Sequence, residues 1–146
     1  MIEIKNVTKT YNGEKKAVDD ISFTVNDGEI FAFIGHNGAG KTTTMRMLTG
    51  NLAPSAGHIK ICGIDLLEKP QEAKTHLGFL PEIPPLYQEM TIDEYLLFAA
   101  KLHRVDQSMI SAALNLAKQR CGLEDRSKYL ISTLSKGFQQ RVGIAQ

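Results

Sequence analysis

The sequence lacks a long hydrophobic run. Its longest, Tyr95–Ala100, is far too short to cross a lipid bilayer. The first five residues, Met1–Lys5, also lack the basic start and the apolar stretch of a secretory signal peptide. Because neither a membrane anchor nor an export signal is evident, we expect a cytoplasmic protein.

Cysteine, metal-ligand clusters and excess charge are scarce as well. Cys62 and Cys121 lie far apart in the chain, which indicates two buried, reduced thiols rather than a disulfide framework. The four histidines have no metal-ligand spacing, so we expect no zinc site. A net charge of +1 gives no reason to expect nucleic acid or an anionic membrane surface as a partner. The 146 residues, 42% hydrophobic and 23% charged, instead describe one globular domain of ordinary size.

A glycine-rich segment is the strongest positive signal. Residues Gly35–Thr42 fit G-x-x-x-x-G-K-T, in which the glycines allow backbone N–H groups to surround phosphate oxygens. Lys41 adds a positive charge for the outer phosphates, and the Thr42 hydroxyl is the expected Mg²⁺ ligand. A bare glycine-rich turn is the weaker alternative, because the apolar residues 30–34 suit a buried parallel strand and residues 43–48 suit a helix. The sequence therefore predicts a nucleoside triphosphate site.

The residues before this loop predict a β-layer. Apolar and polar side chains alternate around Ile4 and Phe23, so residues 1–34 are expected to form antiparallel strands that lead into the loop. The Asn-Gly pair at residues 12–13 predicts a turn between them. Tyr11, just before that turn, is either an ordinary strand-end aromatic or a platform for a flat nucleobase, and the residues alone favour the ordinary reading.

After the loop the sequence changes from strands to helices. We expect a strand over residues 58–62, a helix over 70–76 and a further buried strand over 77–80. Three prolines within residues 81–85 exclude a helix and predict an ordered loop.

Everything from residue 91 onward reads as helical. Thr91 and Glu94 have the spacing of a capping box, which predicts a helix start, and a second helix is expected over residues 107–120. Ser135 is the expected N-cap of a last helix, whose N-terminus is a second potential phosphate site.

Taken in order, these motifs resemble the nucleotide-binding subunit of ATP-binding cassette (ABC) transporters over the whole chain. Gly35–Thr42 matches the family's Walker A motif, and Leu134–Phe138 resembles its signature sequence, usually L-S-G-G-Q. Tyr11 falls where the family has its adenine-stacking aromatic, which turns the balance for this residue toward function. The wording of Pro81–Tyr87 looks most like ABC-2-type exporters.

The resemblance implies an α/β fold. We expect a P-loop NTPase (RecA-like) core with an antiparallel β-subdomain and a helical subdomain, truncated before the family's Walker B strand. Residues 1–82 would form the β-layer and P-loop core, and residues 83–146 would form the helical subdomain with the signature.

The resemblance also implies the site and its cofactors, ATP and Mg²⁺. The expected nucleotide-binding residues are Tyr11, Gly35, Asn37, Gly38, Ala39, Gly40, Lys41, Thr42, Thr43, Ser135 and Gly137, with catalytic roles for Lys41 and Glu82 and metal contacts from Thr42 and Glu82. Glu82 stands where the family usually has glutamine, although a carboxylate can still coordinate Mg²⁺. Lys136 and Phe138 replace the first glycine and the final glutamine of the signature.

Two protein partners are implied. Ser135 and Gly137 would close on ATP held by a second copy in a head-to-tail dimer. Residues 82–95 would dock an integral membrane permease, which selects the substrate and holds this subunit on the inner face of the membrane. The expected direction of transport is export.

The sequence predicts nucleotide binding more strongly than catalysis. The sequence ends at Gln146, before the family's Walker B aspartate and catalytic glutamate, so we expect Mg-ATP binding with little or no hydrolysis by this chain alone. A non-catalytic regulatory fragment is one alternative. A soluble P-loop kinase or GTPase is another, but the guanine-reading Asn-Lys-x-Asp motif is missing and the signature would stay unexplained. A non-transport ABC protein usually has a second cassette or long insertions, which this sequence lacks.

Overall fold

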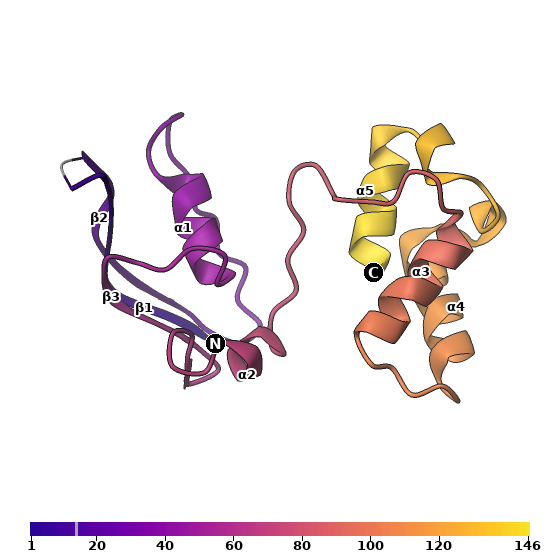
Figure 1. Ribbon diagram of the computed structural model, residues 1–146, viewed down its shortest axis with the longest axis horizontal. Coiled ribbons are helices and arrows are strands. Elements are labelled where there is room, and N and C mark those ends of the chain that lie inside the picture. The colour runs from indigo at the N-terminus through magenta and orange to yellow at the C-terminus, as the bar shows by residue number, and fades with distance from the viewer. Residues whose placement is uncertain (14) are drawn as a thin grey trace. The chain divides into compact units, whose positions relative to one another are not determined.

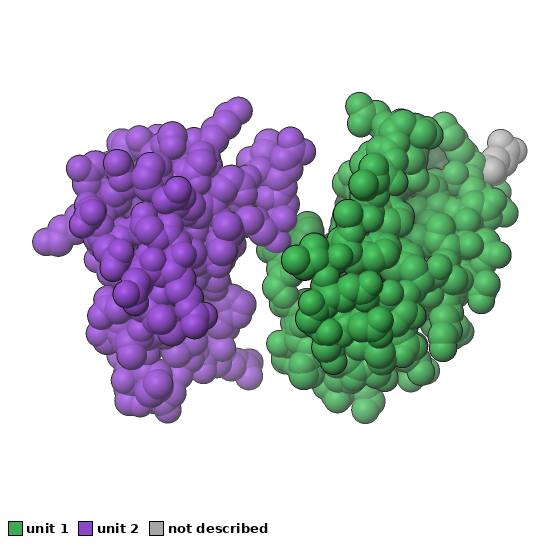
Figure 2. All heavy atoms as spheres, turned by 180° about the vertical axis from the view of Figure 1, so that it is seen from behind, with its two compact units in different colours: residues 1–79 green, residues 80–146 purple. Residues whose placement is uncertain are grey.

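The computed structural model describes residues 1–13 and 15–146 and divides the chain into two compact units. Unit 1 spans Met1–Phe79 and unit 2 spans Leu80–Gln146 (Figure 2). Each unit has its own cluster of buried apolar side chains. Among the described residues, no helix is both long enough and apolar enough to cross a membrane.

Unit 1 is built on an antiparallel sheet of four strands (Figure 1). They are β1 (Ile2–Tyr11), β2 (Lys15–Val25), β3 (Ala56–Ile61) and β4 (Ile64–Asp65), in the spatial order β2-β1-β3-β4. Ile4 of β1 lies opposite Phe23 of β2 and Ile59 of β3. Alternating burial along β2 confirms the half-buried strand predicted from the alternation around Phe23. Asn12 and Gly13 both have positive φ, as the predicted turn after β1 requires.

Two helices complete unit 1. They are α1 (Lys41–Leu48), which follows the glycine-rich loop as predicted, and α2 (Pro70–Lys74), which begins at its proline. Met47 of α1 and Ala73 of α2 share one buried cluster with Ile4 and Ile59 of the sheet. Burial of each large side chain of this kind is worth about 1.5–3 kcal/mol, so the sheet and the helices hold the loop before α1 in place.

Two predicted strands are wrong. Residues 30–34 and 77–80 have no strand structure, and Ile30 and Ile34 are 99% and 88% exposed. Within residues 30–34, Phe31 stacks on Phe23 with the ring centroids 4.9 Å apart, so one side of the segment does pack on the sheet. A strand needs hydrogen-bonding neighbours, however, and no strand in the described part of the chain pairs with either segment. An apolar run predicts burial but does not supply a partner.

Unit 2 is helical, as predicted from residue 91 onward. Its elements are α3 (Ile92–Leu102), α4 (Ile110–Cys121), the short 3₁₀ helices η1 (Glu124–Arg126) and η2 (Ile131–Thr133), and α5 (Lys136–Ala145). Ile92, Leu123, Ile131 and Val142 are fully buried together between them. Gly122 ends α4 in the left-handed conformation, which is typical of a helix C-terminus.

The proline-rich segment of unit 2 is an ordered loop that packs on α5. Pro84 and Leu86 are buried, and the side-chain amide of Gln140 donates to the carbonyl oxygen of Glu82. A Cβ at Gly143 of α5 would lie 2.6 Å from Leu80 Cδ1 and 3.0 Å from Pro84 Cβ. This close contact accounts for the glycine and fixes the loop against the helix.

The capping box at the start of α3 is present and gives a testable stability effect. Thr91 Oγ1 accepts from the Glu94 N–H at 3.3 Å, and Glu94 Oε2 accepts from the Thr91 N–H at 2.8 Å. Because Thr91→Ala removes the hydroxyl, we expect the replacement to destabilise α3 by about 1 kcal/mol. Faster hydrogen exchange of the α3 amides measures the effect.

The same box predicts an acid dependence. Hydrogen bonds from the backbone N–H and the hydroxyl of Thr91 hold the pKa of Glu94 below its ordinary value. Since the folded-state pKa is lowered, this stabilisation is present above the ordinary pKa of a glutamate and is lost as the pH falls through the lowered value. Thr91→Ala should reduce this acid sensitivity. Equal α3 exchange in the variant and the parent at neutral pH would contradict the assignment.

Candidate functional site

The glycine-rich loop closes on itself through its lysine. Lys41 is the first residue of α1, and its ammonium group donates to the carbonyl oxygens of Gly35 at 2.5 Å and His36 at 2.8 Å. The Ala39 N–H also donates to the His36 carbonyl, at 3.2 Å. These bonds turn the carbonyls at the start of the loop toward the lysine. A compact ring of backbone results, with one positive charge at its base.

Three glycines of the loop are constrained in different ways. Gly38 and Gly40 have φ of 84° and 90°, a left-handed conformation that side chains disfavour. A Cβ at Gly38 would meet no atom within 4 Å, whereas a Cβ at Gly40 would lie 2.4 Å from the carbonyl oxygen of Ala17 in β2. Gly35 is also close-packed, since its Cβ would lie 3.1 Å from the Cβ of Ala39. Gly40 is therefore where the loop rests on the sheet.

The first turn of α1 leaves donors free for an anion. Thr44 uses both its N–H and its hydroxyl on the Gly40 carbonyl, at 2.8 and 3.0 Å. Within residues 1–13 and 15–146, the N–H groups of Lys41, Thr42 and Thr43 donate to no protein acceptor, as expected for a helix N-terminus. Such a helix end attracts negative charge, and the lysine beside it adds to that attraction. The arrangement can bind phosphate groups.

The donor set also fits a magnesium ion held mainly by its ligand. No group of three or more His, Cys, Asp or Glu side chains among the described residues could hold a metal ion by itself. The Thr42 hydroxyl is exposed at the loop, and Mg²⁺ is commonly held by few protein ligands together with water and substrate phosphates. The site therefore suits Mg²⁺ that arrives with a phosphorylated ligand.

Tyr11 lies at the end of unit 1 that carries the loop. It is 45% exposed, and the Lys9 ammonium lies 5.6 Å from its ring centroid. Tyr11 pairs with Lys15 at the start of β2, two residues before the Ala17 carbonyl that Gly40 approaches. In Figure 1 the start of β2 and the loop before α1 lie at the same end of this unit. The position leaves the ring free to stack on a base, and stacking stays a prediction.

The remaining predicted site residues belong to unit 2. Ser135 is the N-cap of α5, with its hydroxyl oxygen accepting from the Phe138 N–H at 3.5 Å, so the predicted cap is confirmed. Gly137 is exposed, and a Cβ there would meet no atom within 4 Å. The Glu82 side chain is exposed, and its backbone carbonyl is the atom that contacts Gln140. The roles predicted for these three residues stay predictions.

The sequence did not predict the two arginine contacts on the Phe138 ring, next to the signature. The Phe138 ring has the guanidinium carbon of Arg126 at 4.3 Å and that of Arg141 at 5.0 Å from its centroid. Arg141 lies three residues after Phe138, a spacing that places both on one side of a helix. Arg126 comes from η1 and gave no signal, because its contact depends on the packing of α5.

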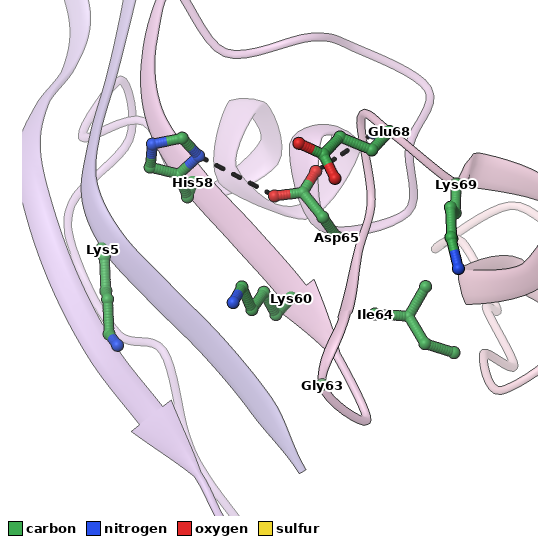
Figure 3. Close-up of a pocket in the computed structure, with 8 residues that line it drawn as sticks. All are labelled: Lys5, His58, Lys60, Gly63, Ile64, Asp65, Glu68 and Lys69. Atoms are coloured by element: carbon green, nitrogen blue, oxygen red, sulfur yellow. Dashed lines mark hydrogen bonds and ion pairs between the residues drawn. The ribbon is translucent and has the colours of Figure 1, made fainter.

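A separate open cavity of about 520 Å³ lies at the β3–β4 end of unit 1 (Figure 3). It is lined by Lys5, His58, Lys60, Gly63, Ile64, Asp65, Glu68 and Lys69. Asp65 Oδ2 lies 3.8 Å from His58 Nδ1, and its other oxygen accepts from the N–H groups of Leu67 and Glu68.

The carboxylate in this cavity has a structural task. Burial raises the pKa of Asp65, but the two N–H groups and the charges of His58 and Lys60 outweigh it and hold the pKa below its ordinary value. Its hydrogen bonds close the turn after β4. We interpret this cavity as the charged outer face of the sheet rather than as a reaction site.

Comparison with known proteins gives a consistent family match. A family model described as ABC transporter matches residues 18–146. The chain is 40% identical to the uncharacterized ABC transporter ATP-binding protein YhcH of Bacillus subtilis, over 100% of this chain and 47% of that protein. It is 36% identical to the bacitracin transport ATP-binding protein BcrA of Bacillus licheniformis, over 100% and 46% respectively. The chain thus spans about half the length of the curated relatives it matches.

Solved structures confirm the predicted fold class. An ATP-binding subunit of an ABC transporter matches 99% of this chain and 60% of its own, with a TM-score of 0.87 and 32% identity. The dimeric cassette MJ0796, solved with bound ADP and phosphate, matches 99% of this chain and 68% of its own, with a TM-score of 0.84 and 25% identity.

Proposed function

This chain belongs to the ABC transporter family, and from that premise we propose that it is the ATP-binding subunit of an exporter with a separate membrane subunit. The observation that carries the proposal is the loop before α1. Its lysine is held by the Gly35 and His36 carbonyls, and the first-turn N–H groups beside it donate to no acceptor in the described part of the chain. Loop, lysine and hydroxyl together suit the phosphates of Mg-ATP.

Each part of the nucleotide has a candidate partner. Tyr11 stacks on the adenine, since it is exposed at the loop end of unit 1. The backbone from Asn37 to Thr43 surrounds the phosphates, with Lys41 at the outer ones. Thr42 contacts Mg²⁺, and Glu82 is the second candidate ligand of the same metal. When bound, the metal supplies positive charge that offsets the charge on the phosphate oxygens.

ATP links two copies of the subunit. Ser135 and Gly137 of one copy contact the nucleotide held by the loop of the other, in a head-to-tail dimer. Two observations support this arrangement: the space around Gly137 is open, and the related cassette MJ0796 is dimeric. ATP binding favours the closed dimer and nucleotide release favours the open one, which gives a two-state element that ATP controls.

The segment around Tyr87 docks the membrane subunit. Ile83 and Tyr87 are exposed apolar side chains in this segment. The Tyr87 ring packs edge-on against the Phe98 ring of α3, with the ring centroids 5.4 Å apart. Export is supported by a relative named for Nod factor export. The subunit then lies at the inner face of the membrane, held there by its partner.

Crosslinking tests the docking. Cysteines at Ile83 and Tyr87 should crosslink to the membrane subunit in assembled complexes, because both side chains are exposed there. Leu86 is unsuitable because it is buried, and a cysteine in its place would disturb the core of unit 2. Met109→Cys, a similarly exposed apolar position before α4, is the matched control. The native thiol of Cys62 is removed beforehand, because it is exposed and not buried as the sequence predicted. Crosslinks at Met109 and none at Ile83 or Tyr87 would contradict the docking assignment.

A further inference from the structure

Phe138 stands where the family signature usually has a glutamine, and its surroundings are unusually charged. The guanidinium groups of Arg126 and Arg141 lie 4.3 and 5.0 Å from the centre of its ring. We refer to Arg126, Phe138 and Arg141 as the arginine clamp. Arg126 also lies 5.6 Å from the ring centre of Tyr129. Two cations therefore gather on one ring at the first turns of α5.

Neither arginine is neutralised within the described residues. No carboxylate there lies within ion-pair distance of Arg126 or Arg141, whereas Lys118 of α4 pairs with Asp93 at 2.7 Å. The acids nearest in sequence, Glu124 and Asp125 of η1, are exposed and pair with neither guanidinium. The charges of the clamp are thus available to a partner.

Contact with the ring favours one position for each guanidinium group. Each cation–π contact is worth about 0.5–1 kcal/mol at an exposed site, which partly offsets the repulsion between two like charges. One terminal nitrogen of Arg141 lies beside Gly122, which leaves room for it because glycine has no side chain. A fixed guanidinium fork loses less conformational freedom on binding an anion than a free side chain does.

The surrounding surface points to a phosphate-bearing partner. Lys128 and Lys136 are exposed cations close in sequence to the clamp. Together with its two arginines they outnumber the nearby acids, Glu124 and Asp125. Ser135, at the start of α5, is exposed in the same turn as Phe138. Guanidinium groups bind phosphate oxygens through two parallel N–H bonds, so a polyphosphate complements this surface better than a neutral ligand would.

We propose that the arginine clamp contacts the phosphates of ATP held by the loop of a second copy. This inference rests on the proposed function and deepens it by naming two residues outside the family motifs. Phe138 has no side-chain amide to contact the nucleotide, as a glutamine would have. The two guanidinium groups on its ring supply the contact to the nucleotide instead. Loss of that charge weakens ATP-dependent pairing of two copies.

Sedimentation of the full-length protein with a non-hydrolysable ATP analogue tests the proposal. Arg126→Gln combined with Arg141→Gln should lower the ATP-dependent dimer association constant about tenfold and reduce its salt dependence. Lys101→Gln combined with Arg104→Gln removes the same charge from exposed positions at the end of α3, and should change that constant less than twofold. Nucleotide affinity is measured for each variant as a dilute monomer, which separates pairing from binding at the loop.

A second pair of variants separates charge from folding. Arg126→Lys with Arg141→Lys keeps both charges and loses the planar fork, so its dimerisation should fall between the parent and the glutamine pair. If the glutamine pair and the lysine pair have the same dimer association constant as the Lys101 and Arg104 control, the inference is overturned. The proposed function would still stand. A parent protein that binds ATP without pairing would overturn the proposed dimer and the inference with it.

Discussion

Lys41→Ala is expected to weaken ATP binding about a hundredfold. The lysine is the one charged side chain of the loop, and its ammonium is held where the Gly35 and His36 carbonyls converge. Removing one partner of a close, hydrogen-bonded charge pair costs 2–5 kcal/mol or more, and each 1.4 kcal/mol is about a factor of ten in affinity. Titration calorimetry with ATP and ADP measures the loss.

Two comparisons make this result specific. Lys60→Ala removes the same charge from an exposed position on the sheet of the same unit and should leave ATP affinity within about twofold. Adenosine has no phosphates, so Lys41→Ala should leave its affinity unchanged. A Lys41→Ala protein that binds ATP within about threefold of the parent would show that the loop is not the phosphate site.

Gly40→Ala is expected to destabilise unit 1 by about 3 kcal/mol. About 1–2 kcal/mol arises from the left-handed backbone, which a Cβ disfavours, and a further 1–3 kcal/mol from overpacking. The new Cβ would overlap the Ala17 carbonyl at 2.4 Å, and that carbonyl belongs to a strand that cannot move independently. Urea unfolding, with exchange of the β1 amides as the readout for unit 1, measures the change.

Gly38→Ala is the matched control in the same loop. Its φ of 84° is as unfavourable for alanine as that of Gly40, but its Cβ would meet no atom within 4 Å. We therefore expect only the backbone term, so that Gly38→Ala destabilises unit 1 by about 1–2 kcal/mol. Equal effects at Gly38 and Gly40 would contradict the contact between the loop and β2.

The features predicted correctly from the sequence are those that local chemistry decides. The capping box of Thr91 and Glu94 and the cap at Ser135 depend on residues within one helical turn, and both are present. The helix after the glycine-rich loop was also predicted from nearby residues alone. The N–H groups of its first turn need no hydrogen-bond acceptor from a distant part of the chain. Such signals are complete within a few residues and can be read without the fold.

The features that were wrong or missed depend on distant parts of the chain. Residues 30–34 have the composition of a buried strand, yet Ile30 and Ile34 are exposed because a strand forms only beside another strand. The contact of Arg126 with Phe138 joins η1 to α5, and no spacing in the sequence predicts it. Tyr11 falls between these cases. Its strand end was predicted, and its stacking on adenine stays a prediction.

Titration of the protein with ATP and with adenosine, each with and without Mg²⁺, tests the central claim most directly. The account predicts one ATP site per chain, adenosine binding at least about tenfold weaker because the phosphate contacts are lost, and stronger ATP binding when Mg²⁺ is present. Adenosine bound as tightly as ATP, or no ATP bound at all, would contradict the account, because the loop of residues 35–42 would then not be a phosphate site.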